Sequence, residues 1–189
     1  MSIDVNKIYL KIPTLEEYWY EQKVLSDPLT MQYNAGWEVS YDGYDYDTGC
    51  IDFPENKWEK DYNRRLEKNR FFAYIIKKET EEFIGYVNFH YNITQDRYDC
   101  GIVIEHAFRG KGYAKDALIE LCLTAFFDYK IDKIYDSFEE DREALILFEK
   151  IGFKVVNKYK SIRFKKEVDG IDVCLTKTDF LNYLENNYE

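Results

Sequence analysis

The sequence has few of the residues that build metal centres or cross-linked folds. Its four cysteines lie far apart without a Cys-x-x-Cys pair, and it has two histidines. We therefore expect no metal site and reduced, isolated thiols. It also lacks a run of about 20 apolar residues, so we expect no membrane-spanning helix. The first residues lack the basic and apolar regions of a secretory signal, which predicts a cytoplasmic protein.

Positive charge is scarce as well. The chain has 26 Lys and Arg against 36 Asp and Glu, and its net charge is −10. Such a surface repels nucleic acid, whose binding depends on neutralised phosphates, so we expect no nucleic-acid partner. One basic cluster is an exception, and we interpret it as the solvated face of a hairpin: Lys158, Lys160, Arg163, Lys165 and Lys166.

Aromatic residues, in contrast, are abundant at 18% of the chain, including 18 Tyr. Tyrosine combines an apolar ring with a hydroxyl, so a surplus is typical of ligand sites and interfaces. A compositional bias of the source genome explains the surplus equally well. The sequence leaves both explanations open.

Hydrophobic periodicity predicts a single domain, residues 1–189, with an α+β (mixed α/β) fold. The expected strands are residues 8–12, 71–77, 83–90, 98–105, 131–138, 153–159 and 171–175. The expected helices are residues 15–25, 57–69, a segment from about 112, residues 140–151, and a short last helix capped by Thr178. Thr14 and Glu17 have capping-box spacing, and Gly152 follows a helix as a C-cap. Asp169-Gly170 predicts the turn between the last two strands.

The segment most suggestive of chemistry is a glycine-containing turn between a strand and a helix, Arg109-Gly110-Lys111-Gly112-Tyr113-Ala114. A helix start leaves backbone N–H groups unpaired and carries partial positive charge, which suits a phosphate group. The glycines alone are equally consistent with a sharp bend. The pattern matches neither the triphosphatase loop nor the dinucleotide fingerprint.

This segment resembles the signature Arg/Gln-x-x-Gly-x-Gly/Ala of the GNAT superfamily of acetyltransferases, through Arg109, Gly112 and Ala114. A second block resembles the late pattern of the same family: Asp141, Ala144, Leu147-Phe148-Glu149-Lys150 and Gly152-Phe153. The string from Arg109 to Ala114 is most similar to the branch containing ribosomal-protein N-terminal acetyltransferases. The resemblance implies a GNAT-like central, largely antiparallel mixed sheet flanked by helices.

The resemblance also implies a cosubstrate, acetyl-CoA, and no metal. Its pyrophosphate would be held by the turn and the helix start, and its pantetheine arm would pair with the preceding strand. The implied cofactor-binding residues are Ile102, Val103, Ile104, Arg109, Gly110, Lys111, Gly112, Tyr113, Ala114, Lys115, Asp141 and Phe148.

For catalysis, the resemblance implies direct attack of a primary amine on the thioester in a ternary complex. An alkyl ammonium with a pKa near 10.4 needs a base. We choose Asp99 first and Glu105 second, both on one side of a strand, although a surface carboxylate is the alternative for each. Many relatives have a tyrosine acid where this chain has Phe148, which cannot donate a proton.

The acceptor site is expected in the early variable segment, where carboxylates alternate with aromatic rings. Such a segment would attract cations by charge and cation–π contacts. The candidate residues are Trp37, Tyr41, Asp42, Tyr44, Asp45 and Asp47. We therefore hypothesise a cationic small molecule or peptide as the amine, with a solvated loop as the alternative.

The sequence is consistent with three functions. The first is an N-acetyltransferase acting on an amine, with a homodimer as a possible assembly. The second is a non-catalytic acyl-CoA-binding or sensing module that has lost the acid at position 148. The third is a partner-binding domain that uses residues 37–53. Thiol release with a panel of amines distinguishes the first from the others.

Overall fold

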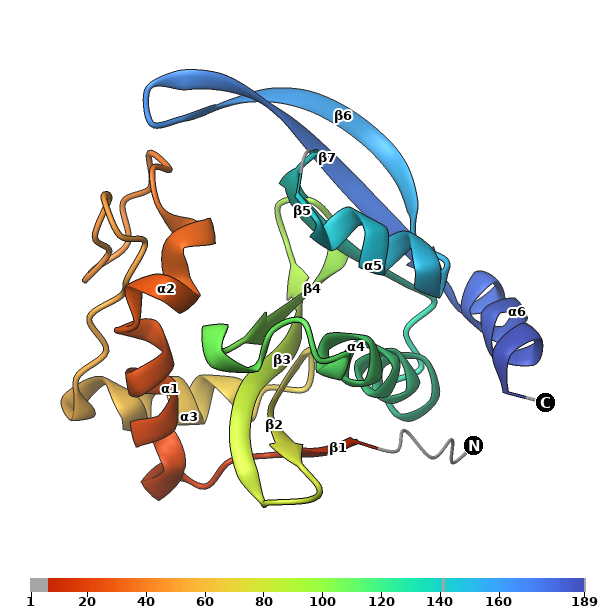
Figure 1. Ribbon diagram of the computed structural model, residues 1–189, viewed down its shortest axis with the longest axis horizontal. Coiled ribbons are helices and arrows are strands. Elements are labelled where there is room, and N and C mark those ends of the chain that lie inside the picture. The colour runs from red at the N-terminus through yellow and green to blue at the C-terminus, as the bar shows by residue number, and fades with distance from the viewer. Residues whose placement is uncertain (1–6, 141, 189) are drawn as a thin grey trace.

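The computed structural model describes residues 7–140 and 142–188, which form a seven-stranded sheet with helices on both faces (Figure 1). The strand order is β1-β2-β3-β4-β5-β7-β6, and β4 and β5 run parallel while the other neighbouring strands are antiparallel. The strands are β1 (Ile8–Lys11), β2 (Arg70–Lys77), β3 (Glu82–Asn92), β4 (Arg97–Ile104), β5 (Lys133–Glu139), β6 (Lys154–Arg163) and β7 (Lys166–Thr176). The expected mixed α+β fold is confirmed.

The helices lie in two groups, with α1 to α3 on one side of the central strands and α4 to α6 on the other (Figure 1). They are α1 (Tyr18–Leu25), α2 (Pro28–Met31), α3 (Trp58–Arg65), α4 (Tyr113–Leu123), α5 (Ala144–Ile151) and α6 (Lys177–Asn187). A 3₁₀ turn, Leu15–Glu17, precedes α1, and the Glu17 carboxylate accepts the Thr14 backbone N–H at 3.0 Å, as the capping box predicts.

Two apolar cores hold these layers together. The larger one packs Leu118 and Phe126, from α4 and the π-helical turn that follows it, with Phe180 of α6 against the strands. The smaller one packs Tyr20 of α1 against Tyr86 and Val103 of β3 and β4. Because each fully buried apolar side chain contributes about 1.5–3 kcal/mol, these cores fix the helices to opposite faces.

The last hairpin corrects the prediction of a turn at Asp169-Gly170. The strands β6 and β7 turn instead at Phe164 and Lys165, which both have positive φ. Gly170 lies inside β7, where a side chain would collide with the Tyr159 ring at 2.3 Å. The glycine therefore provides space for a ring and does not make the turn.

Three other local expectations are also wrong. The last helix is capped by Thr176, whose hydroxyl accepts the Asp179 backbone N–H at 3.1 Å, and not by Thr178. The helix expected over 140–151 begins only at Ala144. Arg163 is not a solvated residue, because its guanidinium is 2.7 Å from the Glu139 carboxylate and 2.8 Å from the Ala35 carbonyl. Gly152 ends α5 with φ 105°, which confirms the C-cap.

Candidate active site

The sheet divides between its two parallel strands. β4 and β5 pair at only two positions, Tyr98 with Ile134 and Asp99 with Tyr135, and then diverge. Beyond Asp99, the edge of β4 that faces β5 has no strand partner within the described residues. The backbone groups along this edge are therefore available to a ligand that pairs with the strand.

Two neighbouring cavities follow this opening. One, of about 440 Å³, lies along β4 and the glycine turn, and includes Ile102, Val103, Ile104, Tyr113 and Ala114 in its lining. The other, of about 290 Å³, lies at the division itself. Both cavities are lined by Tyr33, Ile102, Val103, Arg142, Ala144 and Phe148. A single ligand can therefore extend from the glycine turn to the point where the strands separate.

The glycine turn has the geometry expected of a phosphate site. Gly110 and Gly112 have φ values of 76° and 84°, which side-chain-bearing residues rarely adopt. Helix α4 begins after Gly112 with no side-chain cap, and within the described residues no backbone acceptor is used by the N–H groups of Gly110 or Gly112. This open helix start can receive a pyrophosphate.

The two basic residues of the turn are exposed, and their side chains donate hydrogen bonds to backbone carbonyls. The Arg109 guanidinium donates to the carbonyls of Ile104 at 3.0 Å and Thr30 at 2.8 Å. The Lys111 ammonium donates to the Ala107 carbonyl at 3.0 Å. The structure therefore gives both a role in shaping the turn, and the backbone N–H groups remain the phosphate ligands on offer. Lys115 lies on α4 outside the lining, and Asp141 lies outside the described residues.

Phe148 is at the junction of the two cavities. Its side chain is 2% exposed and packs between the rings of Phe138 and Phe153, with centroids 5.2 and 4.7 Å away. The position therefore offers an apolar wall and no proton.

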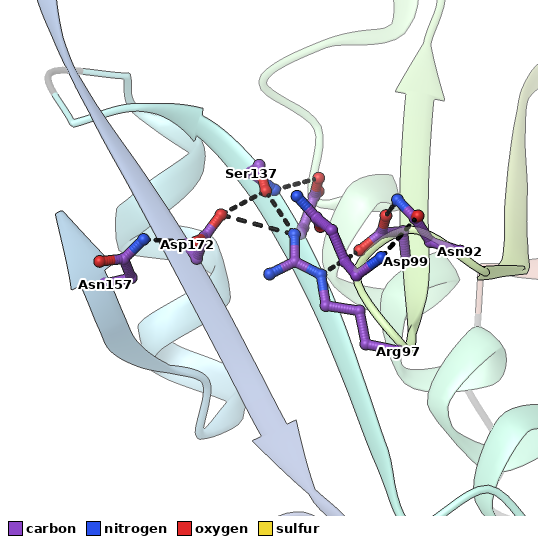
Figure 2. Close-up of polar contacts among 8 residues, drawn as sticks. Asn92, Arg97, Asp99, Ser137, Asn157 and Asp172 are labelled. Atoms are coloured by element: carbon purple, nitrogen blue, oxygen red, sulfur yellow. Dashed lines mark hydrogen bonds and ion pairs between the residues drawn. The ribbon is translucent and has the colours of Figure 1, made fainter. Parts of the chain in front are cut away.

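Asp99 belongs to a polar network across the sheet (Figure 2). Its carboxylate accepts hydrogen bonds from Arg97 Nε and Asn92 Nδ2, each at 2.7 Å. Arg97 also donates to Ser137 Oγ at 2.9 Å, and Ser137 donates to Asp172 at 2.6 Å. Asp99 does not line either cavity, so it is engaged in joining β4 to β5 and β7.

Glu105, the second expected base, is also engaged elsewhere. It is 7% exposed and forms an ion pair with Lys23 of α1, 2.9 Å away. Its other oxygen, Oε1, and the Tyr20 hydroxyl are both buried, and neither has a hydrogen-bond partner among the described residues. Glu105 does not line either cavity, and its contacts tie the end of β4 to α1.

Two carboxylates line the 290 Å³ cavity at the division: Asp136 within β5 and Glu139 at the end of that strand. Glu139 is paired with Arg163, whereas the Asp136 Oδ1 accepts the Ser137 backbone N–H at 2.8 Å. Burial raises the pKa of Asp136 from its ordinary 3.8 to about 7, against the opposing effects of that hydrogen bond and of the Arg142 charge. A group with a pKa near 7 can accept and release protons at neutral pH.

Sequence reasoning missed Asp136, although a signal was present. Ile134 and Phe138 are both buried, and Asp136 is the residue between them in the same phase of the strand. An acid in the inward-facing phase of an alternating strand is unusual, because burying a charge is costly. That exception in the pattern marks a functional candidate.

The early loop contributes one residue to the site. Trp37 lines the 290 Å³ cavity, whereas Asp42 forms a surface ion pair with Lys57 at 2.9 Å. Of the six loop candidates, the five besides Trp37, Asp42 included, do not line this cavity. Asp45 accepts the Thr48 backbone N–H at 2.8 Å, and Tyr44 donates to the Asn34 carbonyl at 2.7 Å. Tyr41 and Asp47 are exposed.

Across the part of the chain that the structure describes, no group of three or more His, Cys, Asp or Glu could hold a metal ion. The same residues include no helix long and apolar enough to cross a membrane. All four cysteines are free, and Cys100, Cys122 and Cys174 are buried.

The comparisons with known proteins agree with this geometry. Residues 10–154 match the family model described as "Acetyltransferase (GNAT) domain". No curated protein sequence is significantly similar to the chain. Among solved structures, a GNAT-family acetyltransferase from Bacillus anthracis is similar with a TM-score of 0.69 and 18% identity, covering 94% of this chain and 99% of that one.

A spermidine N-acetyltransferase from Vibrio cholerae, solved in complex with CoA and spermine, is similar with a TM-score of 0.72 and 18% identity. That match covers 93% of this chain and 98% of the other. At such identities the solved structures establish the fold, and the family model, which spans most of the chain, establishes the membership. With its divided sheet and open helix start, this chain belongs to the GNAT acetyltransferase family.

Proposed function

We propose that the protein is an acetyl-CoA-dependent N-acetyltransferase that acts on a primary amine, with Asp136 as the group that moves the proton. The observation that carries the proposal is the position of the Asp136 carboxyl, whose pKa is raised to about 7. It lies in the 290 Å³ cavity, next to the 440 Å³ cavity along β4 and the glycine turn. Family membership, the free edge of β4 and the uncapped start of α4 support the coenzyme part of the proposal.

Bound acetyl-CoA would supply a thioester carbonyl as the electrophile. The ionised Asp136 takes one proton from the substrate ammonium, either directly or through water, and leaves a neutral nitrogen that attacks this carbonyl. Asp136 then holds the proton that the departing sulfur requires as the C–N bond forms and the C–S bond breaks. The second nitrogen proton leaves to solvent, so atoms and charge balance.

This assignment explains how the chain works without a tyrosine at position 148. A thiol with a pKa near 8.5 is a fair leaving group, and a carboxylic acid with a pKa near 7 is acidic enough to protonate it. Phe148 shields the two cavities from the α5 side, and this lowers the local dielectric around the carboxyl. One residue therefore serves as both base and acid.

The acceptor is a small amine or a peptide N-terminus, and the carboxylates of the 37–53 loop stay candidates for an outer cationic site. The ribosomal-protein branch and the polyamine acetyltransferases represent two such acceptor classes. Neither class is favoured by a residue in the cavity.

The test is thiol release from acetyl-CoA with a panel of polyamines, amino acids, aminoglycosides and peptides. We expect turnover that depends on the amine, together with binding of desulfo-CoA by calorimetry. Binding without turnover on any amine would contradict the proposal and support an acyl-CoA sensor. Absence of both would support the partner-binding alternative.

A further inference from the structure

The 290 Å³ cavity contains two opposite charges that no residue of the described part of the chain neutralises by contact. Its charged lining consists of Asp136, Glu139 and Arg142. Glu139 is paired with Arg163 at 2.7 Å and is 7% exposed, so its charge is balanced. Asp136 and Arg142 influence each other, because the Arg142 charge lowers the pKa of Asp136, but no contact ion pair joins them. The two groups therefore face the same space at a separation.

Arg142 is held in an orientation that leaves its edge available. Its guanidinium lies over the rings of Tyr33 and Phe138, 5.1 and 5.8 Å from their centroids. No carboxylate of residues 7–140 or 142–188 forms an ion pair with it. Stacking uses the faces of a guanidinium and leaves its N–H edge free, and that edge matches a carboxylate through two parallel hydrogen bonds.

The size and walls of the cavity limit the ligand further. A volume of about 290 Å³ is at the lower end of the range for ligand sites, roughly 300–1,000 Å³, and suits a small acceptor. Aromatic rings of Tyr33, Trp37, Tyr86 and Phe138 form one part of its walls, and polar side chains form the rest, including Asn34, Asn88 and Ser137. An aromatic or aliphatic side chain can pack against these rings.

We propose that the acceptor is a free α-amino acid with an apolar or aromatic side chain, bound with its ammonium at Asp136 and its carboxylate at Arg142. This inference rests on the proposed function and makes its substrate specific. A zwitterion satisfies both charges at once, whereas a plain amine leaves Arg142 without a partner in a partly desolvated site. The cationic acceptor expected from the loop is thereby replaced by an acceptor without net charge.

The test compares each of the apolar and aromatic amino acids with its α-amide and with the amine that lacks the carboxyl group, using thiol release. We expect kcat/KM for the best amino acid to exceed that of its amide by 10-fold or more. The α-amino group of the amide is less basic than that of the free amino acid, so more of it is unprotonated at neutral pH and intrinsic reactivity favours the amide. The opposite preference would report recognition of the carboxylate.

The variant Arg142→Gln separates recognition of the acceptor from binding of the coenzyme. We expect it to raise the KM for the amino acid 10- to 100-fold, with little change for the amide and a much smaller change in the KM for acetyl-CoA, although Arg142 lines both cavities. Arg142→Lys, which keeps the charge and loses the planar fork, should restore part of the loss. Arg70→Gln, on β2 and outside both cavities, is the control and should behave as the unmodified protein.

Several results would overturn the inference and leave the proposed function standing. These are turnover of amides, polyamines or peptides at least equal to that of every free amino acid, or an Arg142→Gln effect confined to the KM for acetyl-CoA. The absence of turnover with any amine would remove the proposed function itself, and this inference with it.

Discussion

Asp136 occupies a position where an ionised carboxyl is unfavourable to the folded protein. Its inward-facing neighbours on β5, Ile134 and Phe138, are buried, and burial is the largest cause of its raised pKa. The folded state therefore binds a proton more tightly than the unfolded chain, whose aspartate titrates near 3.9. Stability should fall as the pH rises from about 4 to about 7, because the unfolded state releases this proton first.

Asp136→Asn should remove this cost. The amide oxygen can still accept the Ser137 N–H, and no charge is buried. We expect the variant to be more stable than the unmodified protein by up to about 4 kcal/mol at pH 8, because the rise of the Asp136 pKa from 3.8 to about 7 converts at about 1.36 kcal/mol per unit. The gain should be smaller at pH 5. Urea unfolding at both pH values checks this, and a gain independent of pH would contradict the burial argument.

Between β4 and β5, few backbone pairs join the two halves of the sheet, so side chains must fix the width of the opening. Arg97 is the central link, because it contacts Asp99 on β4, Ser137 on β5 and Asp172 on β7 (Figure 2). Its guanidinium also lies 4.9 Å from the Tyr135 ring centroid. Asn92 and Asn157 extend the network to β3 and β6.

Arg97→Gln should loosen this junction. Hydrogen bonds to charged groups contribute about 1.5–3 kcal/mol each, and two partly buried carboxylates would lose their partner, so we expect a loss of about 2 to 4 kcal/mol. Arg70→Gln removes only an ion pair with the exposed Glu67, which should cost about 1 kcal/mol or less. Equal losses in the two variants, measured by urea unfolding, would count against the network.

The same network gives opposite expectations for the pH dependence of activity. The Arg97 charge lowers the pKa of Asp136, and the Asp99 charge raises it. The inflection in kcat/KM should therefore move to higher pH in Arg97→Gln and to lower pH in Asp99→Asn. Shifts in the same direction would show that general loosening, and not charge, governs Asp136.

At the start of α4, Gly112→Ala tests the turn. Its φ of 84° is strained for alanine by about 1–2 kcal/mol, and relief of that strain would reorient the open N–H groups. We expect weaker binding of CoA, measured by calorimetry. Gly152→Ala, with φ 105° at the end of α5, should destabilise the fold similarly and leave CoA affinity unchanged. Equal effects on affinity would contradict the phosphate role of the turn.

On the scale of the whole molecule, the sequence was informative wherever function depends on adjacent residues. The strand, glycine turn and helix around Gly112 are consecutive, so their periodicity and spacing predicted them. Phe148 was placed in the site by a second contiguous block. The last hairpin was misjudged because Gly170 meets a requirement of tertiary packing, contact with the Tyr159 ring, which no local pattern encodes.

The two residues at the centre of the proposals, Asp136 and Arg142, are harder to find from the sequence, because the topology brings them to one cavity. The resemblance to the family and the strand alternation both indicate Asp99 as the base, yet folding pairs it with Arg97. Asp136 comes near β4 only because the two strands run parallel and then separate. Arg142 and Tyr33 come from distant segments. Such convergence depends on strand order, which is not written in any local pattern.

The most direct test of the role proposed for Asp136 is the pH dependence of kcat/KM for the amine substrate in the unmodified protein and in Asp136→Asn. We expect a rise through about pH 7 in the unmodified protein, where the carboxyl ionises. In Asp136→Asn that inflection should disappear and the rate should fall by about 10²–10⁴-fold, with CoA affinity unchanged. A variant that keeps both the inflection and the rate would contradict the assignment of Asp136.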